Sequence, residues 1–156
     1  MISIPKNIAD MTMEIVQEIH VRAPMDVTFD ALLEEIGPNN QRMDGVPMPM
    51  KIEAWPGGRW YRDLGGDDGH FWGNVQAIKR PSLLEFCGPL MLSYPCVSNV
   101  QYRLTEKDGG TLITFRHTAM GFIQDQQKEQ MNMGWGSMNQ RVRKVAEGSG
   151  SKKAAG

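Results

Sequence analysis

The chain has 156 residues, with 17 Lys and Arg against 18 Asp and Glu and a formal net charge of −1. A chain of this length forms one domain that buries about two thirds of its unfolded surface, and its balanced charge argues against a nucleic-acid binder and against a polybasic membrane surface. No stretch reaches the roughly 20 apolar residues of a membrane span and no secretory leader is recognisable, so we expect a soluble, cytoplasmic protein.

The N-terminal part predicts a loose arm, one strand and one helix. Residues 1–12 show no sustained periodicity, so we expect them to form the arm. Apolar and polar side chains alternate over residues 13–22, as in a half-buried strand, although Gln17 interrupts the apolar face. Residues 24–36 then carry apolar side chains at helical spacing, and Pro24 suits the first turn of a helix.

Six further strands and a long helix complete the prediction. A loop rich in Gly, Pro, Asn and Met covers residues 37–49, and strand and turn signals then alternate regularly. The strands are expected at residues 51–55, 59–64, 70–80, 83–87, 97–106 and 110–119. The final segment carries one apolar stripe at helical steps, made of Met131, Trp135, Met138, Val142 and Val145. We expect Gly148 to cap this helix and residues 148–156 to form a flexible tail, which leaves residues 13–147 as the folded domain.

This order of elements predicts an α+β fold in which one strongly curved antiparallel sheet grips the long C-terminal helix. Gly134 and Gly136 flank Trp135 inside that helix, although each glycine costs roughly 1 kcal/mol there relative to alanine. The two glycines either let the helix backbone approach the sheet or leave an empty volume beside the indole. The sequence leaves both interpretations open.

Five segments of the sequence follow one another in a characteristic order and spacing. They are RAPMDVTFDAL at 22–32, WPGGRWYRDL at 55–64, GHFWGNVQAIKRPSLLEF at 69–86, GTLITFRHTAMG at 110–121 and GW at 134–135. With them the chain resembles the SRPBCC superfamily (START-like, helix-grip), and within it the C-terminal domain of the activators of the ninety-kilodalton heat-shock chaperone ATPase. The resemblance covers about residues 13–145. It implies a cavity between the sheet and the long helix, which in various members holds lipids, sterols, polyketides or other apolar molecules.

The chain departs from this family pattern at two places. Residues 37–45 read GPNNQRMDG, where many relatives carry a tryptophan-rich segment, so ligand contacts of that segment are not carried over. Asn139 stands where leucine is usual in the long helix. We therefore expect the upper rim of the cavity to be more polar than in the family.

Large, flexible apolar side chains that could face this cavity are the candidate ligand-binding residues, because methionine and aromatic side chains adapt to variable apolar shapes. These candidates are Met48, Met50, Trp60, Phe71, Phe86, Met91, Phe115, His117, Met120, Met131, Trp135 and Met138. We expect no catalytic set, no metal and no cofactor. The chain has no glycine-rich phosphate loop, no nucleophile elbow and no HExxH pattern.

The favoured function is noncatalytic binding of a small apolar or aromatic molecule by a monomer or homodimer. His117 shares strand parity with Ile113 and Phe115, on the face assigned inward, and an imidazole can act as an acid or base. A cyclase-like or hydratase-like enzyme acting on an apolar substrate therefore stays an alternative. The resemblance adds a third candidate, a co-chaperone-like activator of a heat-shock chaperone ATPase.

Overall fold

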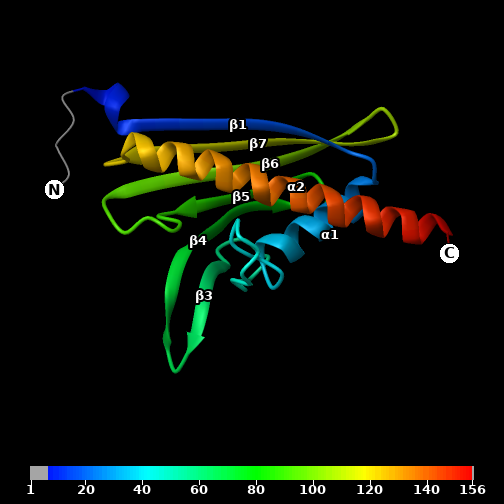
Figure 1. The fold of residues 1–156 in the computed structure, drawn as a ribbon, viewed down its shortest axis with the longest axis horizontal. Helices are drawn as coiled ribbons and strands as arrows, with labels where there is room; N and C mark the ends of the chain where they lie inside the picture. Colours follow the sequence, from blue (N-terminus) through cyan, green and yellow to red (C-terminus); the bar gives the residue numbers. More distant parts are fainter. Residues whose placement is uncertain (1–6, 156) are drawn as a thin grey trace.

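The computed structural model describes residues 7–155, with side chains described to residue 149. Figure 1 shows the sheet with the α-helices on one of its faces. The elements in chain order are the 3-10 helix η1 (Ile8–Met11), β1 (Thr12–Val21), α1 (Met25–Ile36), β2 (Lys51–Ile52), β3 (Arg59–Gly65), β4 (Asp68–Lys79), β5 (Leu83–Gly88), β6 (Cys96–Lys107), β7 (Gly110–Gly121) and α2 (Asp125–Ala155).

The seven strands form one antiparallel sheet in the order β1-β7-β6-β5-β4-β3-β2. Side chains in β1 and β7 alternate between buried and exposed, as expected when one face of a sheet packs on a core and the other meets water. β3 and β4 bend away from the other strands as a projecting hairpin (Figure 1). The predicted α+β, helix-grip architecture is confirmed.

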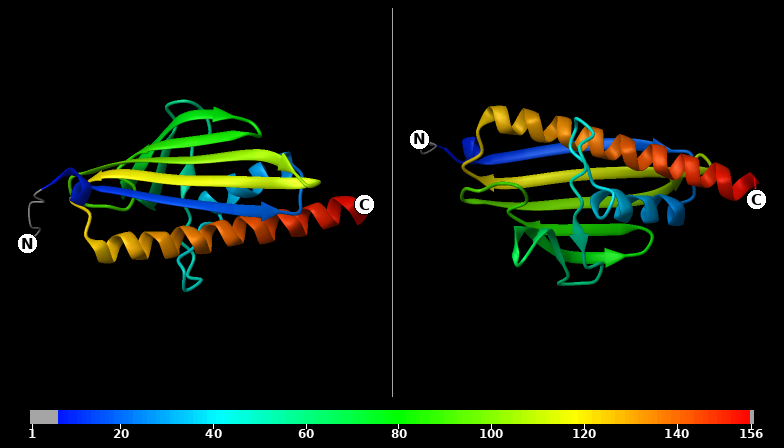
Figure 2. Two further views of the ribbon diagram at one scale, coloured as in Figure 1. Left: turned by 90° about the horizontal axis from the view of Figure 1, so that it is seen from above. Right: turned by 60° about the horizontal axis from the view of Figure 1, so that its bottom comes forward.

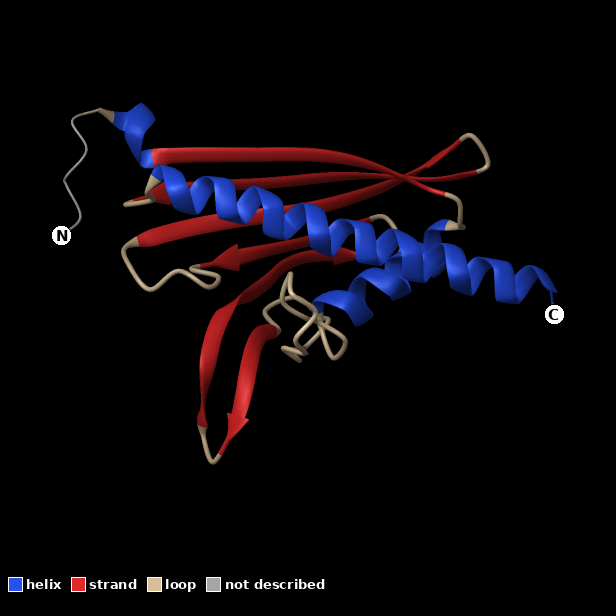
Figure 3. Ribbon diagram, in the orientation of Figure 1, coloured by secondary structure: helices blue, strands red, loops and turns tan. Residues whose placement is uncertain are grey.

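Helix α2 lies along the inner face of the sheet and contacts both α1 and β1 (Figures 2 and 3). Four of the five residues of the predicted apolar stripe are buried, and the fifth, Val145, is partly buried against the core. Trp60 joins β3 to the end of α1, because its indole N–H donates to the Ile36 carbonyl oxygen at 2.9 Å. Its ring also stacks on that of Phe86, with the ring centroids 4.7 Å apart. The inner face of the sheet is thus covered by helix and loop.

The structure differs from the predicted elements at β2 and at the end of α2. β2 is only two residues long, whereas the sequence predicts a strand over residues 51–55. α2 continues past Gly148 to Ala155, so the predicted helix end at Gly148 is wrong. A single helical glycine weakens a helix by about 1 kcal/mol without ending it. Of the predicted arm, residues 1–6 lie outside the described residues and Ile8–Met11 form η1.

A chain of polar groups, buried at Tyr102 and Asn139, joins α2 to the sheet. Asn139 is 1% exposed; its Oδ1 accepts from the Tyr102 hydroxyl at 2.8 Å and its Nδ2 donates to Gln17 Oε1 at 2.9 Å. Gln17 Nε2 in turn donates to the carbonyl oxygen and to Oδ1 of Asn132, each at 3.1 Å. Burial raises the pKa of Tyr102, so its hydroxyl stays protonated and remains a donor. Gln17, the polar residue on the apolar face of β1, therefore binds α2 through hydrogen bonds to Asn132 and Asn139.

This arrangement predicts a non-additive effect on stability. Asn139→Leu should lower the free energy of unfolding by about 1–3 kcal/mol, because it leaves the buried Tyr102 hydroxyl without a partner. Adding Tyr102→Phe should recover part of that loss, since the orphaned hydroxyl is then gone. Urea unfolding of the single and double variants measures both values, and strictly additive effects would show that the hydroxyl has another partner.

Candidate functional site

A cleft of about 870 Å³ opens beside α2, along the helix from Gln127 to Arg141. We call it the α2 cleft. The facing side is made by the loop between α1 and β2, by β3 and β4, and by the loop between β5 and β6. Its lining residues are Asn40, Gln41, Arg42, Met43, Asp44, Met48, Trp60, Trp72, Met91, Leu92, Ser93, Tyr94, Gln127, Gln130, Met131, Met133, Gly134, Trp135, Met138 and Arg141.

Three tryptophans line the cleft, and each has its polar edge satisfied elsewhere. The Trp135 N–H donates to His117 Nδ1 at 3.0 Å, and the Trp72 N–H donates to His70 Nδ1 at 3.1 Å. Trp60 uses its N–H on the Ile36 carbonyl oxygen, as described above. Because no indole donor is left unpaired, the three rings offer the cleft apolar surface.

His117 lies behind Trp135, is fully buried, and does not line the cleft. Indole nitrogen can only donate, so His117 Nδ1 must accept from Trp135, and the proton sits on Nε2, 2.9 Å from Ser98 Oγ. Burial lowers the pKa of His117 from 6.5 to about 4, so the ring is neutral at physiological pH. The inward orientation expected from the sequence is confirmed, but His117 orients Trp135 and has no access to a bound molecule.

The two glycines of α2 have different surroundings. A Cβ on Gly134 would meet no atom within 4 Å, and Gly134 lines the cleft. A Cβ on Gly136 would lie 3.8 Å from Gln17 Nε2, an ordinary contact with β1. Gly134 therefore leaves empty volume beside Trp135, while Gly136 faces the sheet. The two interpretations that the sequence left open apply to one glycine each.

Every cation that lines the cleft has a carboxylate partner. Arg141 Nε lies 3.6 Å from Oε2 of Glu35, which is 5% exposed, and Arg42 is paired with Asp44 at 2.7 Å. Burial raises the pKa of Glu35, and the nearby Arg141 opposes that shift. Arg141 also donates to the Gln41 carbonyl oxygen at 3.1 Å, which ties the loop between α1 and β2 to α2. The cleft thus offers no unpaired cation to an anionic molecule.

Six of the twelve predicted ligand-binding residues line the α2 cleft: Met48, Trp60, Met91, Met131, Trp135 and Met138. Four others are buried in the core without lining it: Met50, Phe86, Phe115 and His117. Phe86 and Phe115 support the cleft from behind, because Phe86 stacks on Trp60 and Phe115 contacts Trp135 with ring centroids 4.8 Å apart.

The two remaining predicted residues, Phe71 and Met120, are exposed and do not line the cleft. Met120 follows the buried Ala119 in β7 and so faces the outer side of the sheet. In β4 the register shifts: Trp60 pairs with Gly73 and Tyr61 with Phe71, so Trp72 is an additional residue. This bulge turns Trp72 inward and Phe71 outward.

Several lining residues were not predicted. Met43 and Met133 belong to the methionine-rich loop and helix, so composition could have indicated them. Tyr94 and Asn40 come from loops, where no periodicity fixes the direction of a side chain. Asn139, expected at the cavity rim, does not line the cleft, because Tyr102 and Gln17 bind it inside the core. The predicted polar rim at Asn139 is therefore wrong.

Two properties of the described residues bear on the kind of site. No group of three or more His, Cys, Asp and Glu side chains within residues 7–149 could hold a metal ion. Within the described part of the chain, neither helix is long and apolar enough to cross a membrane.

The buried imidazole predicts a pH dependence of stability. Because the folded-state pKa of His117 lies near 4 and its ordinary value is 6.5, the unfolded chain takes up a proton that the folded protein does not bind. Stability should therefore fall as the pH drops from 6.5 towards 4, by up to about 3 kcal/mol. The variant His117→Gln should lack most of this slope, because it has no imidazole at this position. Urea unfolding across this pH range gives the free energy of unfolding of the unmodified protein and of the variant. Equal slopes of that free energy against pH would show that His117 is not the group responsible.

Comparison with known proteins supports the fold. Residues 41–147 match the family model described as "Activator of Hsp90 ATPase homolog 1-like protein". No curated protein matches the chain. Solved structures that are similar include protein MLL2253 from Mesorhizobium loti, with 20% sequence identity, a TM-score of 0.62, and coverage of 85% of this chain and 95% of that chain.

Two further structures show the same fold at low identity. CalU16 from Micromonospora echinospora is 22% identical with a TM-score of 0.57, over 91% of this chain and 86% of that chain. The di-domain ARO/CYC StfQ from the steffimycin biosynthetic pathway is 10% identical with a TM-score of 0.65, over 96% of this chain and 54% of that chain. The family model covers more than half of the chain, and the sheet and long helix have the helix-grip arrangement. The protein belongs to the Activator of Hsp90 ATPase homolog 1-like family, within the SRPBCC superfamily.

Proposed function

We propose that the protein binds a small, uncharged apolar or aromatic molecule in the α2 cleft without transforming it. The observation that carries this proposal is the cleft itself, about 870 Å³ in volume and lined by six methionines and three tryptophans. Small-molecule sites measure roughly 300–1,000 Å³ and are mostly apolar with a few polar groups. The length of the cleft suits an elongated molecule, because 14 helical steps from Gln127 to Arg141 span about 21 Å.

The pairing of the charges supports an uncharged ligand. Arg141 is paired with Glu35 and Arg42 with Asp44, so a carboxylate or phosphate entering the cleft would have to compete with an existing partner. Losing solvation without gaining a new counter-ion costs free energy. An apolar molecule meets no such penalty, and methionine side chains can adjust to its shape.

Enzymatic activity is the weaker alternative. Acid or base catalysis needs a titratable group within hydrogen-bond reach of the substrate. His117 is separated from the cleft by Trp135, and both of its ring nitrogens have partners. No histidine, cysteine or glutamate is among the described residues that line the cleft. Of the two acids that do line it, Asp44 is paired with Arg42, and burial raises the pKa of Tyr94. The neighbour named ARO/CYC shares only the fold at 10% identity, so it does not supply a catalytic residue for this chain.

The family description supplies a second candidate, stimulation of a heat-shock chaperone ATPase. That activity would need a surface that binds the chaperone, whereas the proposed function needs a cleft that binds a small molecule. Measuring the chaperone's ATP turnover with and without the protein separates the two functions, and an unchanged rate would remove this candidate.

Filling the cleft should abolish binding. Gly134→Leu places a side chain where Gly134 now leaves open space beside Trp135, and it also raises helix propensity, so the fold should persist. We expect the affinity for Nile red, an uncharged apolar dye, to fall by at least about tenfold, since the volume beside the indole is lost. Dye fluorescence gives the affinity and circular dichroism checks the fold.

Gly148→Leu is the matched control, because Gly148 is an exposed glycine of the same helix that does not line the cleft. It makes the same chemical change and also raises helix propensity. Its affinity for Nile red should equal that of the unmodified protein. Equal binding by the Gly134→Leu variant, or no binding by the unmodified protein, would overturn the proposed function.

A further inference from the structure

Four methionines are exposed among the side chains that the structure describes, and three of them line the α2 cleft. Met43, Met91 and Met133 are 56%, 45% and 62% exposed. The fourth, Met120, is 52% exposed but faces the outer side of the sheet. Solvent-borne reagents that attack thioethers therefore reach mainly the mouth of the proposed site.

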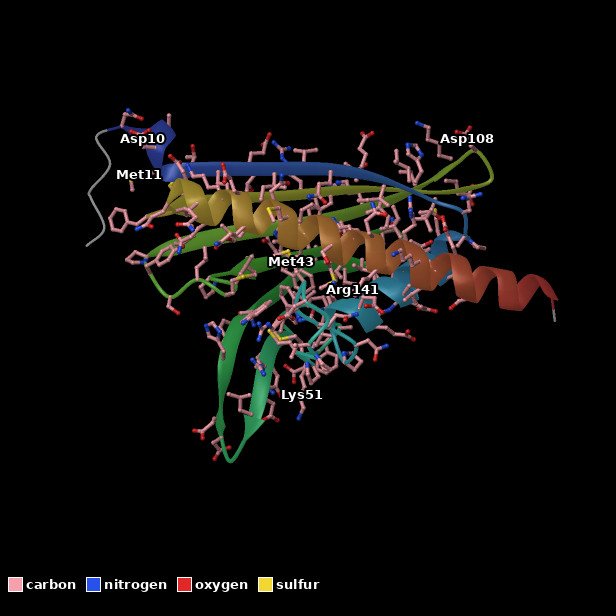
Figure 4. The ribbon with its side chains drawn as sticks, in the orientation of Figure 1. Asp10, Met11, Met43, Lys51, Asp108 and Arg141 are labelled. Carbon is pink, nitrogen blue, oxygen red and sulfur yellow. The ribbon has the colours of Figure 1, made fainter. Side chains whose placement is uncertain are left out.

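The three exposed cleft methionines come from three separate parts of the fold. Met43 lies on the loop between α1 and β2, Met91 on the loop between β5 and β6, and Met133 on α2. Figure 4 shows Met43 beside α2, near Arg141, which lines the same cleft. Together they form a rim of thioethers around the opening, which we call the methionine rim.

We propose that the methionine rim is an oxidation site, and that peroxide-driven conversion of Met43, Met91 and Met133 to sulfoxides weakens ligand binding in the cleft. This inference rests on the proposed binding function. In each step the thioether sulfur gives up two electrons, the O–O bond of hydrogen peroxide breaks, an S–O bond forms, and water leaves as the reduced product. The product is a polar side chain in place of a flexible apolar one.

Burial separates these sulfurs from the methionines deeper in the cleft. Met131 and Met138 line the cleft but are 5% and 7% exposed. Exposure controls access to the oxidant, so low peroxide should modify the rim before these side chains. The sulfoxides would then lie where an apolar ligand enters, while the core methionines and the fold stay unchanged. Methionine sulfoxide reductases can reverse the reaction, so binding would be restored.

The experiment uses the full chain with Cys87→Ser, since Cys87 is an exposed thiol outside the cleft that would also consume peroxide. Peptide mass spectrometry after graded hydrogen peroxide gives the order of oxidation, and Nile red fluorescence gives the affinity before and after. We expect Met43, Met91 and Met133 to be oxidised before Met131 and Met138, and the affinity to fall by about tenfold. Treatment with the two sulfoxide reductases should restore it.

Two variants assign the effect to the rim. The first variant is the triple substitution Met43→Leu/Met91→Leu/Met133→Leu. Its affinity for Nile red is measured before and after peroxide treatment, and the ratio of the two values should stay near one. Met120→Leu removes an exposed methionine outside the cleft, so its loss of affinity should match that of the parent protein. Unchanged binding after full oxidation of the rim, or equal peroxide sensitivity in the triple variant, would overturn this inference. If the unoxidised protein does not bind Nile red, the proposed binding function itself is wrong. The methionine rim would then surround no binding site.

Discussion

The hydrogen bond from the Trp135 indole to Nδ1 of His117 is the interaction on which the site depends. It joins α2 to β7, and Ser98 on β6 fixes the other ring nitrogen of the histidine. A tryptophan held in this way cannot turn its polar edge towards the cleft. The imidazole stays neutral because burial lowers its pKa, so the ring remains an acceptor for the indole at ordinary pH. The histidine that the sequence offers as a candidate acid or base is therefore a positioning residue.

The rest of α2 is held so that one side of the helix is packed and the other side stays open. Asn139 and Asn132 bind Gln17, which fixes α2 to the edge strand β1. Arg141 reaches Glu35 on α1 and the Gln41 carbonyl oxygen on the following loop. These polar contacts hold the helix without filling the space between it and the hairpin of β3 and β4. Gly134 adds to that space because it carries no side chain.

Periodicity predicted the fold well, because alternating strands and the apolar stripe of α2 are repeated signals. It located the site less well, since a cleft is formed by single side chains from loops and irregular strand positions. The parity that correctly turns His117 inward also turns Met120 outward, so that error could have been avoided from the sequence. The bulge that exchanges Phe71 for Trp72 could not, because a register shift depends on the pairing of two strands. Asn40 and Tyr94 lie in loops whose path follows from tertiary packing alone.

The most direct test of the account is to observe the cleft methionines while a ligand binds. Labelling the methionine methyl groups with carbon-13 gives one NMR signal for each residue, and Nile red can be titrated into the protein. The account predicts shifts for the six cleft residues, which are Met43, Met48, Met91, Met131, Met133 and Met138, while the outward-facing Met120 and the core residue Met13 stay unchanged. Shifts centred on Met120, or no shifts at saturating dye, would contradict the claim that α2 covers a binding site.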